Sequence, residues 1–559
     1  MATEFRNPLE SVLHYHARTK HHLNAYARSL GYLDWATQPD PFRRFAGAPQ
    51  FLLDHPPQTA EPYFDALFSA ESVTPQSLHR RTISQLFYDS LALTAWKQAP
   101  GTAPWSLRSN PSSGDLHPTE GYLIAGPIQD LSAEAGVYHY APYEHALEQR
   151  MTFTTAEWHT IADQLPPGGI LVGLASIYWR ESWKYGERGF RYCHHDVGHA
   201  IGTVSLAAAI LGWQTRLLES IADQDLAKLL CIHCQQGIEA EHPDCLLAVF
   251  PASTSVAPAT ARLQLPSALL ERLANATPTG TENPLSREHH AWPIIDEVAQ
   301  ATAFRGLPDR RKLAYGKKLP EAETGILSER RLSARRLVQQ RRSAVAMDGH
   351  TRICREMFYH MLARVTPHLS PFPFQVLSWR PRTALVLFVH RINGLPPGLY
   401  LLAREASHRQ SLQTAMQQEF RWEKPAACPA GLELYLLETG DAQQAAEIIS
   451  CHQNIAAAGA FSLGMLAEFE SSLTQQGPWF YPRLFWETGL IGQVLYLEAE
   501  AAGIRATGIG CFFDDALHQL LGIEDGSWQS LYHFTIGGPV EDTRLKTLHP
   551  YFHLGKERT

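Results

Sequence analysis

One sequence pattern occurs twice in this chain, at two places far apart. The two copies lie within residues 191–216 and 483–507, and their alignment pairs Gly198 with Gly489. Each copy continues as an apolar helical stripe and ends at a glycine, a common helix terminator. A duplicated domain is the simplest cause. The chain is then expected to be its own two-fold partner, with a site built between its halves.

Other markers support the duplication. The alignment pairs Asp196 with Glu487, an acidic residue near the start of each helix. Two triplets recur in the same order: Arg80-Arg81-Thr82 and Arg341-Arg342-Ser343, then Gly136-Val137-Tyr138 and Gly398-Leu399-Tyr400. Two amphipathic helices can resemble each other by chance, but recurrence in matched order argues against chance.

The length of 559 residues exceeds what one hydrophobic core usually supports, so two or more domains are expected. We predict an N-terminal extension (1–70), a first repeat (71–250), a linker rich in Pro, Ala and Thr (251–335) and a second repeat (336–559). Helical periodicity mixed with short β-type runs predicts an α+β layer fold. A long helix is predicted over 441–473.

Composition excludes some classes of protein. The net charge of −8 argues against a general nucleic-acid binder, which needs a basic surface. The N-terminus lacks the apolar core of a signal peptide, and the longest apolar runs are too short to cross a bilayer. We therefore predict a cytoplasmic protein without a membrane partner. Eight cysteines in so long a chain do not predict a disulfide framework.

Two segments could hold a ligand. The loop 108–120, RSNPSSGDLHPTE, offers backbone N–H groups and hydroxyls to a planar heterocycle with many acceptors. A surface loop of turn residues is the alternative. Residues 341–343 put two guanidinium groups beside a hydroxyl, a good phosphate clamp. The alternative there is the end of a basic helix.

The segment 183–192 carries the best catalytic candidates. Lys184 and Tyr185 are adjacent groups with high reference pKa values. A desolvated lysine can serve as a base, and a nearby cation would make a tyrosine hydroxyl a better acid. The alternative is that these residues are ordinary surface side chains.

Two segments near the C-terminus are weaker candidates for ligand binding. In ATGIGCF, Gly508 and Gly510 would let the backbone approach a flat ring closely, although a lone Gly-x-Gly is weak support. Further on, GGPVEDTRLK places Arg544 where it could grip a phosphate.

Taken in order, these motifs resemble the nitroreductase superfamily of flavoproteins, and within it the azoline-oxidase branch of SagB/ThcOx-type dehydrogenases. PSSGDLHPTE, GVYHY, SWKYGERGFRY followed by DVGH, ATGIG and GGPVEDTR are similar to that branch's motifs. The resemblance covers roughly residues 75–250 and 335–550.

The resemblance implies a nitroreductase-like fold in tandem duplication, with FMN as cofactor. Family members are normally homodimers that bind FMN between subunits, so here the two repeats would form an intramolecular pseudo-dimer. Lys184 and Tyr185 would be the catalytic pair. The implied FMN-binding residues are Arg108, Ser109, Pro111, Ser112, Ser113, Gly114, Arg341, Arg342, Ser343, Gly508, Ile509, Gly510 and Arg544.

Each repeat departs from the family pattern in a different place. The second repeat has Pro373-Phe374-Gln375-Val376 where the first has Pro111-Ser112-Ser113-Gly114, and the first has Trp213-Gln214-Thr215-Arg216 near the position of the second repeat's glycines. The surviving elements are complementary. We therefore predict one FMN per chain, with the second pseudo-symmetric cleft empty.

Histidines and cysteines also cluster at 193–199 and 231–245. His195 and His199 have the i, i+4 spacing of helical metal ligands. The cysteine spacing fits no common zinc pattern, and buried cysteine is more often a small hydrophobe. No metal is predicted.

The leading hypothesis is an FMN-dependent oxidoreductase that moves hydride between its substrate and flavin N5. The family implies an azoline-like heterocycle in a modified peptide as one substrate class, with O2 as acceptor. An NAD(P)H-dependent nitro or quinone reductase is the alternative. A non-catalytic flavin- or ligand-binding subunit is another, motivated by the motifs lost from each repeat. The sequence does not determine oligomerisation beyond the pseudo-dimer.

Overall fold

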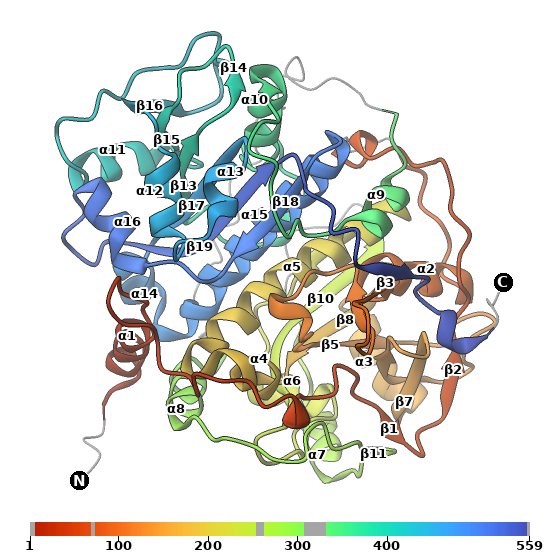
Figure 1. The fold of residues 1–559 in the computed structure, drawn as a ribbon. Helices are drawn as coiled ribbons and strands as arrows, with labels where there is room; N and C mark the ends of the chain where they lie inside the picture. The colour runs from red at the N-terminus through yellow and green to blue at the C-terminus, as the bar shows by residue number, and fades with distance from the viewer. Residues whose placement is uncertain (1–5, 69–72, 253–261, 307–330, 556–559) are drawn as a thin grey trace.

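The computed structural model describes residues 6–68, 73–252, 262–306 and 331–555. Two antiparallel sheets, one from each half of the chain, flank a pair of long helices (Figure 1). These helices are α5 (Gly189–Ile210) and α15 (Tyr481–Ala501), which contain the two copies of the repeated pattern. The helices pack on one another, so the duplicated sequence forms the contact between the halves.

The two sheets have the same strand order. In space the first runs β2 (Gln50–Leu52), β7 (Ala146–Phe153), β6 (Ala135–Ala141), β5 (Thr119–Ala125), β8 (Ile170–Ser176), β10 (His242–Pro251), β9 (Trp213–Leu217). The second runs β16 (Leu434–Thr439), β15 (Gly398–Leu402), β13 (Thr383–Val389), β17 (Phe461–Glu468), β19 (Trp528–Gly537), β18 (Arg505–Ile509). Apart from β2, the strands correspond one to one in both spatial and chain order. This topology confirms the mixed fold class and is consistent with the predicted duplication.

The helices correspond as well. The pairs are α4 (Tyr178–Tyr185) with α14 (Glu470–Gln476), α5 with α15, and α6 (Asp223–Leu229) with α16 (Asp514–Leu521). A short 3-10 turn precedes the central strand of each half, η3 (Ser113–Asp115) before β5 and η7 (Phe374–Val376) before β13. The predicted alignment of the loop 111–114 with 373–376 therefore matches the positions of these turns.

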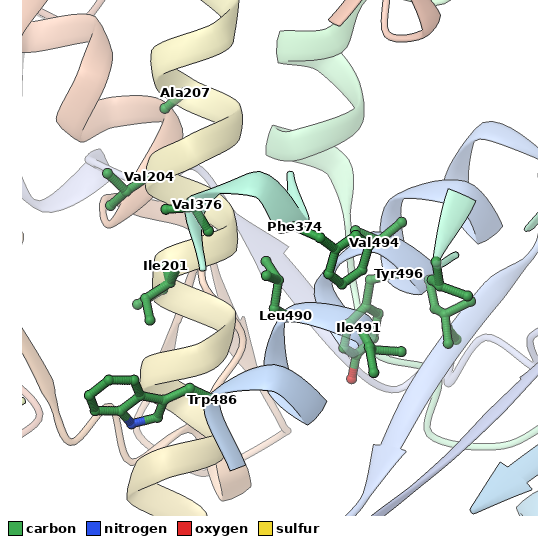
Figure 2. Close-up of a cluster of buried hydrophobic side chains, with 14 of the residues drawn as sticks. Ile201, Val204, Ala207, Phe374, Val376, Trp486, Leu490, Ile491, Val494 and Tyr496 are labelled. Atoms are coloured by element: carbon green, nitrogen blue, oxygen red, sulfur yellow. The ribbon is translucent and has the colours of Figure 1, made fainter. Parts of the chain in front are cut away.

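The core between the halves is apolar and shared. Ile201, Val204 and Ala207 of α5 lie in one buried cluster with Trp486 and Leu490 of α15, and the turn η7 adds Phe374 and Val376 (Figure 2). Both helices are buried on nearly all sides, as expected of helices sandwiched between two sheets.

The ends of the chain each join the opposite half. Helix α1 (Pro8–Arg18) packs on the second half, where His16 hydrogen-bonds the Tyr481 hydroxyl (3.2 Å) and the Gln529 side chain (3.2 Å). Strand β20 (Lys546–Leu548) pairs with β3 (Leu93–Gln98), and β4 (Trp105–Arg108) lies on the other side of β3. In Figure 1 the red helix lies in the blue half and the dark blue strand in the orange half.

The remaining helices pack around the paired sheets and the two long helices. They are α2 (Arg80–Ser90), α3 (Thr155–Ala162), α7 (Ser267–Asn275), α8 (Pro293–Ala301), α9 (Ala334–Gln340), α10 (Arg355–Arg364), α11 (Ala406–Ala415), α12 (Gln443–Ile449) and α13 (Asn454–Ala458). In the described ranges, every helix is too short or too polar to span a bilayer.

The prediction of one long helix over residues 441–473 is wrong. That segment forms α12, α13, strand β17 and the start of α14. Every residue of β17 is buried, because β17 is a central strand covered on both faces. Its sequence, FSLGMLAE, consequently lacks the alternation that marks a half-exposed strand.

Two further expectations need correction or restriction. The two arginine-containing triplets are not structural equivalents, since Arg80 begins α2 whereas Arg341 follows the end of α9. The region expected as an N-terminal extension supplies β2 to the first sheet. Residues 253–261 and 307–330 of the expected linker, and 1–5 and 556–559 at the ends, lie outside the described residues.

Candidate functional site

Two adjoining cavities lie between the halves of the chain. We call the first, of about 160 Å³, the basic cavity, because Lys97, Arg108, Arg341, Arg342 and Arg505 line it. The second, of about 400 Å³, is the tyrosine cavity, lined by Tyr185, Tyr192, Tyr496 and Tyr532 among others. The cavities share four lining residues, Pro111, Ser112, Asp115 and Ser343, so they form one continuous site.

Three arginines of the basic cavity, two of them buried, lack an anionic partner among the described residues, whereas Arg505 pairs with Glu541 and Glu500. Within the described part of the chain, Arg108, Arg341 and Arg342 have no carboxylate at ion-pair distance. They donate instead to carbonyls and a threonine: Arg341 Nη2 donates to the Arg108 carbonyl (3.0 Å) and Arg342 Nη2 to the Thr94 carbonyl (3.1 Å). Burial lowers the pKa of Arg108 and of Arg342 to about 10, so both stay charged at neutral pH. Such uncompensated cations favour an anionic ligand.

The loop 111–115 forms the wall common to both cavities. The Ser112 hydroxyl accepts from the His117 backbone N–H (2.8 Å), and the Ser113 N–H donates to Asp196 (3.2 Å). Gly114 has φ +63°, a left-handed conformation that favours glycine. The sequence-predicted Pro111, Ser112, Ser113 and Gly114 thus all line the site.

Lys184 and Tyr185 stand at the end of α4 and reach the same loop. A Cβ added to Gly114 would lie 2.7 Å from Lys184 Nζ and 2.7 Å from the Tyr185 hydroxyl oxygen. The two polar groups therefore converge above Gly114, at the edge of the tyrosine cavity. The Tyr185 ring packs against Tyr192, with centroids 4.4 Å apart.

Burial, followed by the Coulombic effect of Glu181, raises the pKa of Tyr185 well above its usual value. Tyr185 is therefore protonated at neutral pH. The expectation that a neighbouring lysine would make this hydroxyl more acidic is not met, because desolvation and nearby carboxyl groups outweigh the cation.

Three buried carboxyl groups gather beneath Lys184. Burial raises the pKa of Asp196 to about 8, despite hydrogen bonds from Ser112 and Ser113, and that of Asp115 to about 6, although Arg341 opposes this. Burial and the neighbouring Asp196 raise the pKa of Glu181 well above its usual value. The floor of the site can thus hold protons near neutral pH.

The second half supplies the opposite wall through β18. Gly508 and Gly510 line the tyrosine cavity, together with Ile509. The Gly508 N–H donates to the Tyr496 hydroxyl (2.9 Å), which also bonds Ser343 Oγ (2.8 Å). A Cβ at Gly508 would clash with Tyr532, and one at Gly510 with Tyr192. Glycine is required at both positions because tyrosine side chains press against the backbone there.

Two predicted binding residues lie away from the cavity surfaces. Ser109 is buried, and its hydroxyl donates to the Tyr88 carbonyl (3.3 Å). Arg544 is exposed and pairs with Asp542 (2.8 Å). Arg505 and Lys97 line the basic cavity instead. They come from β18 and β3, and no local motif singled them out.

Asp196 is the clearest residue that the sequence reasoning did not assign to the site. Its partner in the alignment, Glu487, is fully engaged: it accepts from the backbone of Arg382 (3.0 Å) and Thr383 (3.2 Å) and pairs with Arg404 (2.5 Å). Within the described residues, Asp196 has no arginine or other cation at ion-pair distance. The alignment with Glu487 marks the position of Asp196, but the missing counter-ion is visible only in the tertiary structure.

The pseudo-symmetric second cleft also exists, with a volume of about 340 Å³. It lies between β9 and the turn η7, and the rings of Phe68 and Phe372 pack edge to face there, with centroids 5.3 Å apart. Among its described lining residues Arg216 is the one basic side chain, in contrast to five in the basic cavity. This cleft therefore lacks the charge that an anionic ligand needs.

The histidines with metal-like spacing make hydrogen bonds across the helix pair instead. His195 bonds the Thr488 hydroxyl (3.0 Å), and His199 bonds Gln493 (3.3 Å) and the Tyr532 hydroxyl (3.3 Å). In the described ranges, the group with ligand atoms close enough for a metal is Asp65, His360 and Glu498. Arg364 pairs with Asp65 (2.7 Å) and Glu498 (3.3 Å), which places a cation there already.

Some known proteins match part of this chain, and a solved structure matches nearly its whole length. Residues 400–538 match the Nitroreductase family model. "Putative nitroreductase MJ1384" of Methanocaldococcus jannaschii is 30% identical over 130 residues, or 22% of this chain. The match spans 65% of that relative's length, less than two thirds.

The crystal structure of a putative nitroreductase from Anabaena variabilis superposes with a TM-score of 0.65 at 20% identity, covering 95% of this chain and 99% of that one. At this identity the likeness concerns the fold alone. The chain therefore carries a nitroreductase family domain at residues 400–538, within a fold that over nearly its whole length is nitroreductase-like.

Proposed function

We propose that this protein is an FMN-dependent oxidoreductase that binds one FMN in the joined cavities. The main observation behind this proposal is that Arg108 and Arg341, which are buried, and Arg342, which is partly buried, line one of the two adjoining cavities without an anionic partner in the described ranges. A phosphate group would supply the missing negative charge, and the tyrosine cavity would take the ring system.

The residues present fit this cofactor. The basic cavity also holds a buried acceptor atom without a partner, Asn110 Oδ1, and a buried donor without one, Arg341 Nε. Buried polar atoms are normally hydrogen-bonded, so a ligand with both donors and acceptors accounts for them. The volume of the tyrosine cavity, about 400 Å³, is within the range of ordinary ligand sites.

Different residues of the site would bind the phosphate, enclose the ring system and transfer protons. Arg341, Arg342 and Ser343 would hold the phosphate, while the loop 111–114 and residues 508–510 would enclose the ring. Bound FMN would supply hydride-transfer chemistry at N5. Tyr185, which is protonated, would donate a proton to a reduced substrate, and Lys184 would orient the substrate or accept a proton in the opposite direction.

For the substrate we propose the SagB-type reaction, oxidation of an azoline-like heterocycle in a modified peptide. The sequence motifs around Lys184 and Tyr185 support it. The reducing direction, with NAD(P)H as donor and a nitro or quinone compound as acceptor, is the second candidate, favoured by the raised pKa of Tyr185. Retention of Lys184 and Tyr185 at the cavity edge argues against a purely ligand-binding subunit.

A titration of the purified protein with FMN and with riboflavin tests the proposal. We expect one FMN per chain, with a flavin absorption spectrum, and weaker binding of riboflavin because it lacks the phosphate. Two flavins per chain would contradict the single-site assignment. Equal affinity for the two flavins would contradict the role of the basic cavity.

A further inference from the structure

Two cysteines from distant segments meet at the wall of the tyrosine cavity. Cys451 follows helix α12, and Cys511 follows strand β18. Their thiols are close enough to influence each other's ionisation, and Cys511 raises the pKa of Cys451. Two hydrogen bonds hold the segment around Cys451 against the segment around Cys511. The Phe513 N–H donates to the Ile449 carbonyl (2.8 Å), and Gln453 Nε2 donates to the Cys511 carbonyl (2.9 Å).

The surroundings of Cys511 favour its thiolate. His21 Nδ1 accepts from the Ala27 N–H (2.8 Å), which leaves Nε2 as the nitrogen able to donate to Cys511. The guanidinium of Arg188 is also close, since it donates to the Gly510 carbonyl (3.2 Å). The neighbouring Cys451 thiol, and after it His21, lowers the pKa of Cys511 to about 5.

The pair is partly accessible, unlike the three buried cysteines Cys193, Cys231 and Cys245. Cys451 and Cys511 are both half-buried, and Cys511 lines the tyrosine cavity, so a small molecule in that cavity can reach its sulfur. By contrast, Cys193 and Cys245 are buried, and burial raises the pKa of each thiol. A partly exposed thiolate beside a second thiol is the arrangement typical of reactive cysteines.

The backbone at Cys451 is also unusual. Cys451 and His452 have φ angles of 55° and 58°, a left-handed conformation that non-glycine residues seldom adopt. Such strain is more common at functional sites than elsewhere.

We propose that Cys451 and Cys511 form a redox-active dithiol that reacts with small organic disulfides entering the tyrosine cavity. The Cys511 thiolate attacks one sulfur of the disulfide, forms a mixed disulfide and releases the other half as a thiolate, which takes up a proton. Cys451 then loses its proton and attacks the Cys511 sulfur, releasing the second half. The protein loses two electrons and two protons, and the small disulfide becomes two thiols. The reaction itself does not require flavin, although it takes place at the wall of the cavity proposed above for the flavin ring.

The test uses the full-length protein equilibrated in buffers of reduced and oxidised glutathione, then acid-quenched, alkylated and mapped by mass spectrometry. We expect a disulfide between Cys451 and Cys511 that disappears as the buffer becomes more reducing. The exposed Cys354 should remain free of any bond to another protein cysteine. If both Cys451 and Cys511 stay fully alkylatable in the most oxidising buffer, the proposal is overturned.

Serine variants assign the order of attack. In Cys451→Ser, the reaction should stop at a stable mixed disulfide on Cys511, whereas in Cys511→Ser, Cys451 should remain unmodified. Cys354→Ser is the matched control and should form the Cys451–Cys511 disulfide as the parent protein does. A mixed disulfide that accumulates on Cys451 in the Cys511→Ser variant would overturn the assignment of Cys511 as the attacking thiol.

Discussion

Gly198 of α5 and Gly489 of α15, which occupy the same position in the two sequence repeats, touch each other where the helices cross. A Cβ added to Gly489 would lie 2.9 Å from the Gly198 Cα, and one added to Gly198 would clash with the Trp486 carbonyl. The absence of side chains lets the two backbones approach closely. This contact fixes the separation of the halves, and hence the width of the cavities between them.

Gly198→Ala is expected to destabilise the fold by roughly 1–3 kcal/mol, because the added methyl group meets backbone atoms that cannot move separately. Urea unfolding followed by circular dichroism measures the change. Gly526→Ala is the control, since the nearest atom to its Cβ would be 3.6 Å away, and it should change stability by less than about 0.5 kcal/mol. Equal effects of the two substitutions would show that the crossing is not tightly packed.

Arg342→Ala should weaken FMN binding by about ten- to a hundred-fold, the equivalent of roughly 1.5–3 kcal/mol for hydrogen bonds to a charged group. Riboflavin binding should change far less, because the arginine is assigned to the phosphate. Fluorescence titration with both flavins measures this. Arg544→Ala is the control and should leave both affinities unchanged, as Arg544 is exposed and does not line the cavity. An equal loss for both flavins would contradict the assignment.

Lys184→Ala and Tyr185→Phe should each reduce turnover by about 10²–10⁴-fold, the usual contribution of a positioned acid or base. FMN affinity should stay within a few-fold of the parent protein. Stopped-flow reduction and reoxidation of bound flavin, with absorbance at the flavin band, measures the rates. Tyr32→Phe, on an exposed side chain, is the control. Full activity in both site variants would remove these residues from the mechanism.

Because of Asp196, the free energy of unfolding should decrease as the pH rises. Its pKa is about 8 in the folded protein and about 3.9 in an unfolded chain, so between these values the unfolded state releases a proton that the folded state retains. The free energy of unfolding therefore decreases as the pH rises from about 4 to about 8. Below about pH 4 the carboxyl group is protonated in both states, and Asp196 no longer changes the stability.

Asp196→Asn should therefore flatten the decline in unfolding free energy between about pH 4 and pH 8. Urea unfolding at pH 5 and pH 8 measures the difference. The exposed Asp163 serves as control, and Asp163→Asn should keep the parent protein's pH dependence. An unchanged slope in Asp196→Asn would mean that this carboxyl group is ionised in the folded protein.

Much of the site could be predicted because its elements are contiguous in sequence. The loop 111–114, the pair Lys184 and Tyr185, and the segment 508–510 each carry their residue pattern within a few positions. Arg505 and Lys97 could not be predicted in this way. They reach the basic cavity because β18 and β3 approach it from different halves, and β3 is paired with β20 from the far end of the chain.

The sequence by itself determined that two distant segments share one helical pattern, since matching glycines and acidic residues can be aligned without knowledge of the chain path. It also determined which loops could face a cofactor. Tertiary structure alone decided that residues 461–468 form a buried strand, that Asp196 lacks the counter-ion that Glu487 has, and that Cys451 meets Cys511. The physical reason is that burial, charge compensation and thiol contact depend on residues tens to hundreds of positions apart, and no local spacing records them.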